Sequence, residues 1–322
     1  ADIALVFIGL TEEYESEGYD RKHMNLPSSH NNLVEEIAKV NENVVVILSG
    51  GSPVTMPWLG NVKAVLNGYL GGQASGTAVA QILTGKDNPP GRLAETYPLC
   101  LEDVPCAKYY PGTELLAEHT EGIYIGYRYY DSAKKDVLFP FGFGLSYTSY
   151  EYSDLAVKQS SDGTISAWVT VTNTGSAAGR EIIQLYVTKP ETTLEQAKLE
   201  LCGFAKTGLL APGESETVKI TVTEDALKSY DEGDSAWILD SGEYTVSVGA
   251  SVKDIKFTDT FTVTEKQVIL DVENQCVPEV PFDYISKNTY NAYVYTIGLY
   301  ESAGVEATSE VAYYMNALSS NY

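Results

Sequence analysis

A short stretch of the chain carries three carboxyl groups within six residues, at Glu15, Glu17 and Asp20. Carboxyl groups give and take protons in general acid–base catalysis, and a carboxyl acts as an acid only if it is protonated at the working pH. Burial or a neighbouring carboxylate raises a carboxyl pKa and favours that state. The stretch can therefore supply a proton donor. Acidic clusters in surface loops are more commonly solvated charge, so both interpretations stay open at this point.

Other residue types that carry chemistry form weaker patterns. The glycines between Gly71 and Gly76 lack the lysine and the spacing of phosphate-binding loops, and no Gly-x-Ser-x-Gly nucleophile elbow is present. The four cysteines are too scattered for a disulfide scaffold, although Cys100 and Cys106 could bridge locally. The histidines have no metal-ligand spacing (His23, His30 and His119). The sequence therefore predicts neither a cofactor nor a bound metal.

The acidic stretch follows an apolar run at residues 3–8, which predicts a strand buried on both faces. Helical spacing at Leu33, Ile37 and Val40 comes next, then a second buried strand at residues 44–48. A third strand is predicted at residues 62–66 and a helix at 77–83. This alternation predicts an α/β domain with a mostly parallel sheet. The acidic loop, residues 11–25, then lies at the carboxyl end of a strand, where ligands usually bind.

From about residue 150 the pattern changes to short alternating runs. Turn sequences rich in Gly, Asn, Asp and Pro separate these runs, and the spacing predicts an antiparallel β-sandwich. After about Lys266, a loop-like stretch with two prolines leads into a Tyr- and Ala-rich tail, with a helix predicted near residues 309–318. The alternating runs are residues 164–172, 182–187, 217–222, 244–248 and 257–263.

The composition limits the class of protein. The chain has 322 residues, enough for about two domains, and 44% of them are hydrophobic, which suffices for packed cores. A formal charge of −23 repels phosphate backbones, so nucleic acid is a poor partner, whereas neutral sugars are not excluded. No apolar run is long enough to span a bilayer, and no membrane partner is expected. The compartment stays open, since the bacterial cytoplasm and secretion fit equally well.

Several stretches, in one collinear order, resemble glycoside hydrolase family 3 β-glycosidases. Residues 15–21 (ESEGYDR) with 24–27 (MNLP) resemble that family's acid/base loop, and residues 43–57 and 71–93 resemble the elements that follow it. The most distinctive pieces are residues 121–131 (EGIYIGYRYYD) and 139–147 (FPFGFGLSY). The resemblance extends to about residue 264, through short matches at residues 173–175, 210–215 and 241–244 to the family's fibronectin type III-like domain.

The resemblance implies three parts. Residues 1–149 are expected to form an α/β sandwich domain that is incomplete on its N-terminal side. Residues 150–266 are expected to form a fibronectin type III or immunoglobulin-like sandwich, and residues 267–322 an extension of unknown role. The family's (β/α)8 barrel, which carries the nucleophile, has no counterpart in the sequence. We therefore expect it elsewhere, in cis or on another chain.

The resemblance also assigns roles within the acidic loop. Many family members place the proton donor directly before a Gly-Tyr pair, where Glu17 stands, and others place it two residues earlier. Glu17 is therefore the expected general acid/base, and Glu15 is the reserve candidate. Gly18 is expected to let the loop turn sharply, while Asp20 and Arg21 are expected to form an ion pair that shapes it.

The function implied is part of a retaining β-glycosidase, of the β-glucosidase or β-xylosidase type, that hydrolyses terminal β-linked sugars. Without its barrel the chain is expected to be inactive. Trp58 is a candidate for lining a sugar subsite, although core tryptophans are commoner. The alternative is a non-catalytic carbohydrate-binding or interaction module with the same fold. An incomplete sheet would leave an unpaired edge, so pairing with another polypeptide, including a second copy in a homo-oligomer, is expected.

Overall fold

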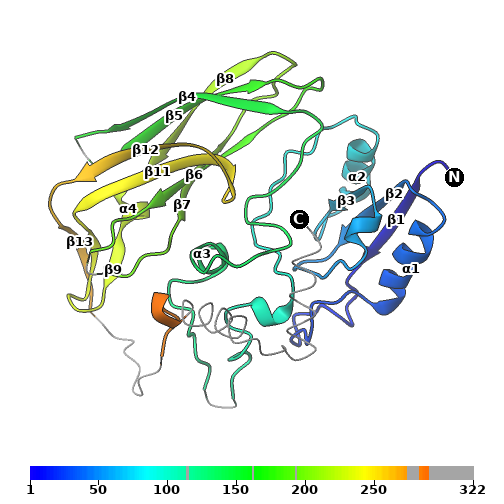
Figure 1. The fold of residues 1–322 in the computed structure, drawn as a ribbon, viewed down its shortest axis with the longest axis horizontal. Coiled ribbons are helices and arrows are strands. Elements are labelled where there is room, and N and C mark those ends of the chain that lie inside the picture. The colour runs from blue at the N-terminus through cyan, green and yellow to red at the C-terminus, as the bar shows by residue number, and fades with distance from the viewer. Residues whose placement is uncertain (114–115, 162, 193, 274–282, 290–322) are drawn as a thin grey trace, which may run out of the picture.

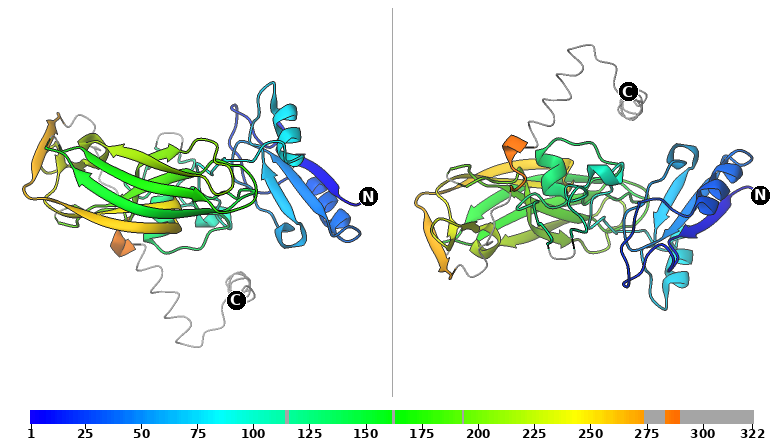
Figure 2. Two further views of the ribbon diagram at one scale, coloured as in Figure 1. Left: turned by 90° about the horizontal axis from the view of Figure 1, so that it is seen from above. Right: turned by 90° about the horizontal axis from the view of Figure 1, so that it is seen from below.

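The computed structural model describes residues 1–113, 116–161, 163–192, 194–273 and 283–289. A small α/β part contains the N-terminus and a larger β-sandwich follows it (Figure 1). The two further views show these parts side by side along the long axis of the molecule (Figure 2). Within the described ranges, no helix is long and apolar enough to cross a membrane.

Three parallel strands form the sheet of the α/β part. β1 (Ala4–Gly9) pairs with β2 (Val44–Ser49), which pairs with β3 (Ala64–Asn67). Helix α1 (Ser28–Ala38) joins the first two strands, and helix α2 (Ser75–Leu83) follows the third. The predicted α/β pattern with a parallel sheet is therefore confirmed. Its core consists of Val6, Ile8, Leu26, Val34, Val44, Val46, Leu48, Val54, Met56, Trp58 and Tyr97.

The two faces of β1 are not equally covered. Val6 and Ile8 are buried in one cluster with Val34 of α1. On the opposite face, Leu5 is 50% exposed and Phe7 is 62% exposed. The prediction of a strand buried on both faces was therefore wrong for the described chain. An apolar run reports the character of its side chains, but it does not report how many layers pack on the sheet.

The connection between the two parts, residues 84–149, has little regular structure. It contains short helices at Leu101–Asp103 and, as α3, at Tyr127–Ser132. Tyr97 bridges to Phe139, so the connection returns to the sheet before it enters the sandwich. Cys100 and Cys106 are not joined by a disulfide, so the local bridge considered from the sequence is not formed. Cys100 Sγ instead donates to Asp103 Oδ2 at 3.3 Å.

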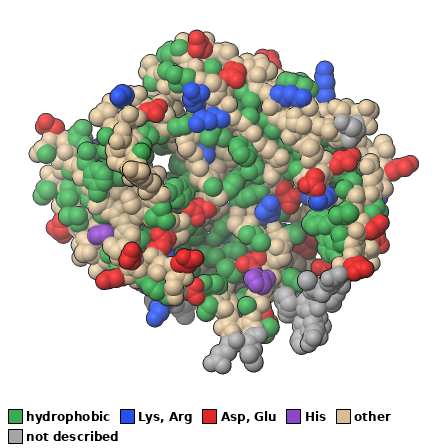
Figure 3. Space-filling model, turned by 180° about the vertical axis from the view of Figure 1, so that it is seen from behind, with side chains coloured by type: hydrophobic (Ala, Val, Ile, Leu, Met, Phe, Trp, Pro, Cys, Tyr) green, Lys and Arg blue, Asp and Glu red, His purple; other side chains and the backbone are tan. Residues whose placement is uncertain are grey.

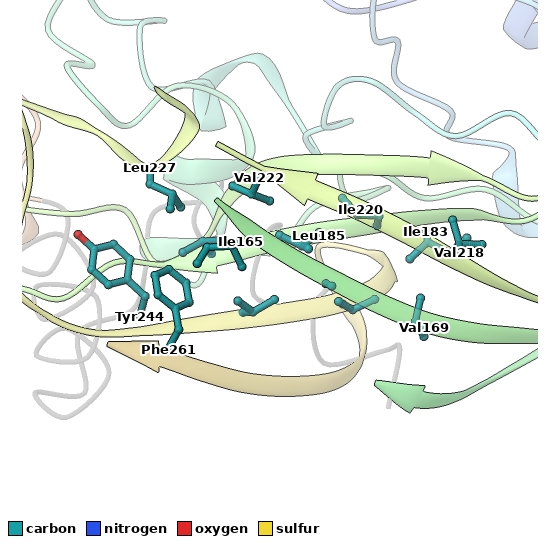
Figure 4. Packing of buried hydrophobic residues seen from close by; sticks show 14 of the residues in the cluster. Ile165, Val169, Ile183, Leu185, Val218, Ile220, Val222, Leu227, Tyr244 and Phe261 are labelled. Atoms are coloured by element: carbon teal, nitrogen blue, oxygen red, sulfur yellow. The ribbon is translucent and has the colours of Figure 1, made fainter. Parts of the chain in front are cut away.

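Two antiparallel sheets form the β-sandwich. One contains β4 (Tyr150–Gln159), β5 (Ile165–Asn173) and β8 (Ser215–Val222). The other has the order β12-β11-β6-β7, with bounds Asp254–Val263, Gly242–Ser251, Ile182–Thr188 and Glu200–Lys206. Their inner faces share one hydrophobic core, in which Tyr244 stacks on Phe261 with ring centroids 5.0 Å apart (Figure 4).

A third small sheet and one short helix complete the sandwich. The sheet has the order β13-β10-β9, with bounds Gln267–Asp271, Ala236–Leu239 and Ser229–Asp231, and helix α4 is Glu224–Leu227. All five predicted runs are strands, so the antiparallel prediction is confirmed, whereas β4, β7, β9 and β10 were not predicted. β13 lies where a loop was predicted. The helix predicted near residues 309–318 lies outside the described residues.

A buried ion pair joins the α/β side to the sandwich. Arg92 Nη2 lies 2.7 Å from Glu181 Oε1, and the two side chains are only 7% and 5% exposed. The same Glu181 oxygen accepts a hydrogen bond from the Ile182 amide at 2.7 Å. Gln184 adds a neutral contact at this joint, since its Nε2 donates to the Gly142 and Ala250 carbonyls at 3.0 and 2.7 Å. The orientation of the two parts therefore depends on polar groups that are shielded from water.

Substituting Glu181→Gln should lower the free energy of unfolding by about 3 kcal/mol, because the Arg92 guanidinium would stay buried without its counter-charge. Urea unfolding followed by circular dichroism measures this change. The matched control is Glu36→Gln, which breaks a solvent-exposed pair with Lys39 and should leave the unfolding midpoint nearly unchanged. If both variants unfold like the wild type, the Arg92–Glu181 pair does not stabilise the joint.

Candidate active site

The acidic loop lies where the parallel strands end. Gly9, the last residue of β1, is paired with Ser49, the last residue of β2, so the loops that start at Leu10 and Gly50 leave the sheet next to each other. The amide of Leu10 donates to the Ser49 carbonyl at 2.9 Å, which continues the pairing by one step. Further along, the Thr55 amide donates to the Met24 carbonyl at 3.0 Å. The sequence-based placement of the loop beside a strand end is thus observed.

Glu15 is bound to the loop that follows β2. Its carboxylate accepts a hydrogen bond from the Gly51 amide at 2.7 Å and another from Ser52 Oγ at 2.5 Å. A Cβ atom placed on Gly51 would lie 3.2 Å from one of these carboxylate oxygens and 3.0 Å from Leu70 Cδ1. The absence of a side chain at Gly51 therefore gives the Glu15 carboxylate its access to the backbone.

Arg21 binds the same loop from the other side of the turn. Its Nη1 donates to Ser52 Oγ at 2.6 Å and to the Pro53 carbonyl at 3.2 Å. Burial lowers the pKa of Arg21, and the nearby Glu15 carboxylate acts in the opposite direction. An arginine remains protonated under either influence, so this guanidinium is a fixed positive charge beside the acidic loop.

Two expectations for the loop were wrong. Asp20 and Arg21 do not form an ion pair within the part of the chain that the structure describes, since Tyr110 donates its hydroxyl hydrogen to Asp20 and Arg21 is bound to Ser52. Gly18 has no positive φ, and a Cβ added there would meet only Ser16 Oγ, at 3.8 Å. The loop turns sharply at this point, but the turn does not depend on the conformational freedom of glycine.

Glu17 lies at the tip of that turn. Ser16 and Tyr19 form an antiparallel bridge, and the Gly18 amide donates to Ser16 Oγ at 3.2 Å, so Glu17 and Gly18 are the two residues between the bridged pair. Both are exposed. The Glu17 carboxylate takes part in none of the hydrogen bonds or ion pairs found among the described residues. It is therefore available to a group that approaches from outside, whereas the Glu15 carboxylate is already bound.

A second carboxyl group lies behind the loop. Burial raises the pKa of Glu95, and the Glu15 charge adds to the effect, while the nearby Tyr69 hydroxyl opposes it. Tyr97 lies next to this group and is fully buried; its hydroxyl accepts from Asn67 Nδ2 at 2.8 Å, and burial raises its pKa to about 12. Glu95 also lines a cavity of about 630 Å³ together with Arg21 and Ser52.

Trp58 is fully buried, with none of its surface exposed. Its Nε1 donates to Asn31 Oδ1 at 2.8 Å, which satisfies the polar end of the ring inside the core. In this structure the indole offers no face to a sugar, and it packs as the commoner core tryptophan. No group of three or more His, Cys, Asp or Glu side chains in the described ranges could hold a metal ion.

Sequence reasoning missed the residues that hold the loop in place. The sequence shows Gly51 and Ser52 only as part of a longer motif, and no pattern in it points to Glu95. A signal for Gly51 and Ser52 was present, because they directly follow the second buried strand and so belong to the same sheet edge as the acidic loop. Nothing in the sequence links Glu95 to that edge, since it arrives there through an irregular connection.

Comparison with known families identifies the α/β part that carries the exposed carboxylate loop and the antiparallel sandwich joined to it. Residues 1–147 match the glycosyl hydrolase family 3 C-terminal domain, and residues 181–252 match the fibronectin type III-like domain. The chain belongs to glycosyl hydrolase family 3, of which it contains the C-terminal part.

Curated relatives and solved structures show the same similarity. The chain is 46% identical to thermostable β-glucosidase B of Acetivibrio thermocellus, over 82% of this chain and 35% of that protein. It is 41% identical to an exo-α-(1→6)-L-arabinopyranosidase of Bifidobacterium longum, over 80% of this chain and 34% of that protein. The chain thus spans about a third of the length of these relatives.

Among solved structures, the family 3 β-glucosidase of Bifidobacterium adolescentis aligns with a TM-score of 0.80 at 38% identity, over 86% of this chain and 41% of that one. β-Glucosidase 3B of Thermotoga neapolitana, solved with glucose, aligns with a TM-score of 0.77 at 37% identity, over 83% of this chain and 38% of that one. Both matches include most of the present chain, so the joint arrangement of its two parts is shared with them.

The raised pKa of Glu95 predicts a pH dependence of stability. Because the folded state holds this proton more tightly than the unfolded state, the contribution of Glu95 is fully present below its ordinary pKa of 4.5 and is lost as the pH rises through the folded pKa. Glu95→Gln should therefore lose less stability than the wild type between about pH 4 and pH 7. Urea unfolding at both pH values measures the difference. Equal losses of stability in Glu95→Gln and in the wild type would contradict this prediction. The control is Glu13→Gln, which makes the same change in the exposed loop.

Proposed function

We propose that this chain supplies the general acid/base of a retaining β-glycosidase that hydrolyses terminal β-linked sugars. Glu17 is the proton donor, and the nucleophile lies on a (β/α)8 barrel outside these 322 residues, in cis or on a separate chain. The proposal rests on the difference between two carboxylates of the same loop. Glu15 accepts two hydrogen bonds inside the protein, whereas Glu17 stands exposed at the tip of the turn with its carboxylate uncommitted.

The proposed reaction has two steps. In the first, the carboxylate nucleophile on the barrel attacks the anomeric carbon while Glu17 donates its proton to the glycosidic oxygen, which leaves as an alcohol. In the second, Glu17, now a carboxylate, takes a proton from water as that water attacks the anomeric carbon and releases the nucleophile. The two carboxyl groups must approach to about 5–5.5 Å, so Glu17 has to face the barrel. A carboxylate at the tip of a surface turn suits this requirement.

The choice of sugar is proposed to lie outside this chain. Its relatives include proteins named as β-glucosidases and as exo-α-(1→6)-L-arabinopyranosidases, with identities of 46% and 41% over nearly the same residues. A region that is similar in both groups is a poor candidate for distinguishing glucose from arabinose. The proton donor, by contrast, is needed whatever the sugar. The non-catalytic alternative is not favoured, because these similar proteins are named as hydrolases.

The α/β domain is proposed to occupy residues 1–149, as expected from the sequence. The fibronectin type III-like domain was expected at residues 150–266, and only its C-terminal limit is changed in this proposal. β13 pairs with β10 of the sandwich, so we propose that the second domain extends to Asp271. No role is proposed for the remaining residues.

In the complete enzyme, Glu17→Gln should lower kcat/KM for an alkyl β-glucoside by about 10²–10⁴-fold, the usual contribution of a general acid. For a 2,4-dinitrophenyl β-glucoside the loss in the first step should be much smaller, since that leaving group departs without a proton. Steady-state hydrolysis of both substrates, by this chain joined to or co-expressed with a family 3 barrel, measures the difference.

The matched control is Glu13→Gln, an identical change at another exposed position of the same loop, which should leave both rates near the wild-type values. Full activity of Glu17→Gln on the alkyl glucoside would refute its role as the acid. Turnover by the 322-residue chain alone would refute the proposal that the nucleophile lies elsewhere.

A further inference from the structure

We propose that Glu15, Ser52 and Arg21 form a clamp that positions the Glu17 turn, with the Ser52 hydroxyl as the anchor shared by both legs of the turn. This inference rests on the proposed function of Glu17. It assigns Glu15 as a positioning residue that does not transfer the proton. The clamp consists of these three side chains and the hydrogen bonds between them.

The hydrogen bonds converge on one hydroxyl group. Ser52 Oγ donates to Glu15 Oε1 at 2.5 Å and accepts from Arg21 Nη1 at 2.6 Å. A serine hydroxyl has one hydrogen to donate and two lone pairs to accept with, so both bonds form at the same time without competing. Each bond includes one charged partner, and charge-assisted hydrogen bonds are shorter and stronger than neutral ones.

The clamp encloses the turn in sequence. Glu15 directly precedes the bridged pair Ser16 and Tyr19, and Arg21 follows it by two residues. Both legs are therefore fixed to one point on the loop after β2, and the two residues at the tip project beyond it. Backbone contacts strengthen each attachment, from the Gly51 amide to Glu15 at 2.7 Å and from Arg21 to the Pro53 carbonyl at 3.2 Å.

The anchor itself is held by regular structure. Ser52 lies three residues after Ser49, the last residue of β2, and β2 is buried over Val46, Ile47 and Leu48. The exposed turn is thus connected, through two short side-chain contacts, to the loop that leaves the buried strand β2. Proton transfer depends on placing the donor to within a fraction of an ångström, and a turn attached on only one leg would swing.

The chemistry separates Glu15 from Glu17 by what each carboxylate already binds. The Glu15 carboxylate already accepts hydrogen bonds from the Gly51 amide and the Ser52 hydroxyl, and Arg21 binds the same hydroxyl beside it. A carboxyl group that is committed to donors inside the protein is a good anchor, and it is poorly placed to give a proton to a group that approaches from outside.

The first test measures the clamp without reference to catalysis. In the 322-residue chain, Ser52→Ala removes the shared hydroxyl, whereas Ser52→Thr retains it. Amide hydrogen exchange of residues 15–21 should become about tenfold faster in Ser52→Ala, as expected for the loss of a charge-assisted hydrogen bond, and should stay near the wild-type rate in Ser52→Thr. Exchange in β2 and β5 reports global stability and should not change. Unchanged exchange of the loop in Ser52→Ala would overturn the clamp.

The second test distinguishes positioning from proton transfer, in the enzyme joined to or co-expressed with a family 3 barrel. Ser52→Ala and Glu15→Gln should lower kcat about tenfold on an alkyl β-glucoside, while the alkaline limb of the pH–kcat/KM profile persists. Glu17→Gln should abolish that limb. Ser52→Thr should restore kcat.

Azide provides a further test, because a β-glycosyl azide should accumulate only when the acid/base residue has been removed. Azide needs no general base, so it attacks the anomeric carbon of the glycosyl-enzyme, and the carboxylate nucleophile leaves. β-Glycosyl azide should form with Glu17→Ala and not with Glu15→Ala. The azide product from Glu15→Ala would show that Glu15 is the acid/base and overturn this assignment. Wild-type activity of Glu17→Gln would instead refute the proposed function, which the exchange measurement does not depend on.

Discussion

The parallel pairing of β1 with β2 runs without a shift from Ala4–Val44 to Gly9–Ser49, and the geometry of the candidate site depends on it. Both strands end at the same level, so the two loops that leave them start side by side. A slip of the register by one residue would turn every side chain of β1 to the other face and would expose Val6 and Ile8. Burial of these two residues against α1 therefore fixes where along the sheet the two loops start, at Leu10 and Gly50. The starting points of the loops in turn set the distance between Glu15 and Ser52.

The β-sandwich is held to the rest of the chain by ion pairs with buried members. Both side chains of the Arg92–Glu181 pair are shielded from water, whereas the buried Asp131 of α3 is 2.7 Å from a Lys253 side chain that is 44% exposed. A fully buried pair such as Arg92–Glu181 contributes little net stability, but it imposes one orientation, since any other arrangement would leave a charge unpaired. The chain also has an excess of acidic residues, and Asp and Glu side chains are spread over the surface that is seen from behind (Figure 3). The orientation of the two parts therefore depends on the few charged side chains that are buried, and not on the many that are exposed.

The sequence predicts the positions of helices and strands better than it predicts what packs against them. Period and turn signals identify β2, β5 and β11, because those strands have the burial pattern that the apolar residues suggest. They do not identify β7, whose Gly203 and flanking charges weaken the pattern, nor the open face of β1, which depends on what packs there. The apolar spacing suggested Leu33, Ile37 and Val40 for the first helix. Ile37 does pack partly buried against the core, but Leu33 is 45% exposed and Val40, beyond the end of α1, is 85% exposed. Val34 is the buried residue of α1. At the candidate site, Glu17 is recognisable by its motif. The partners of Arg21 are not, because a pairing between adjacent charges looks equally plausible until Ser52 is placed nearby.

Three carboxyl groups near one edge of the parallel sheet lie in three different environments. Glu15 accepts hydrogen bonds from a backbone amide and from a hydroxyl that is also bound by a guanidinium. Glu95 is withdrawn from water, so its pKa is raised and its protonated form is favoured. Glu17 is exposed, and under the proposed function its environment would be completed by the barrel that docks over the turn. A proton donor gains from this arrangement, because burial by a partner and the negative charge of an approaching nucleophile both favour the protonated form of a carboxyl group. The isolated chain leaves Glu17 solvated, and under the proposed function the docked barrel would bring both the burial and the second carboxylate.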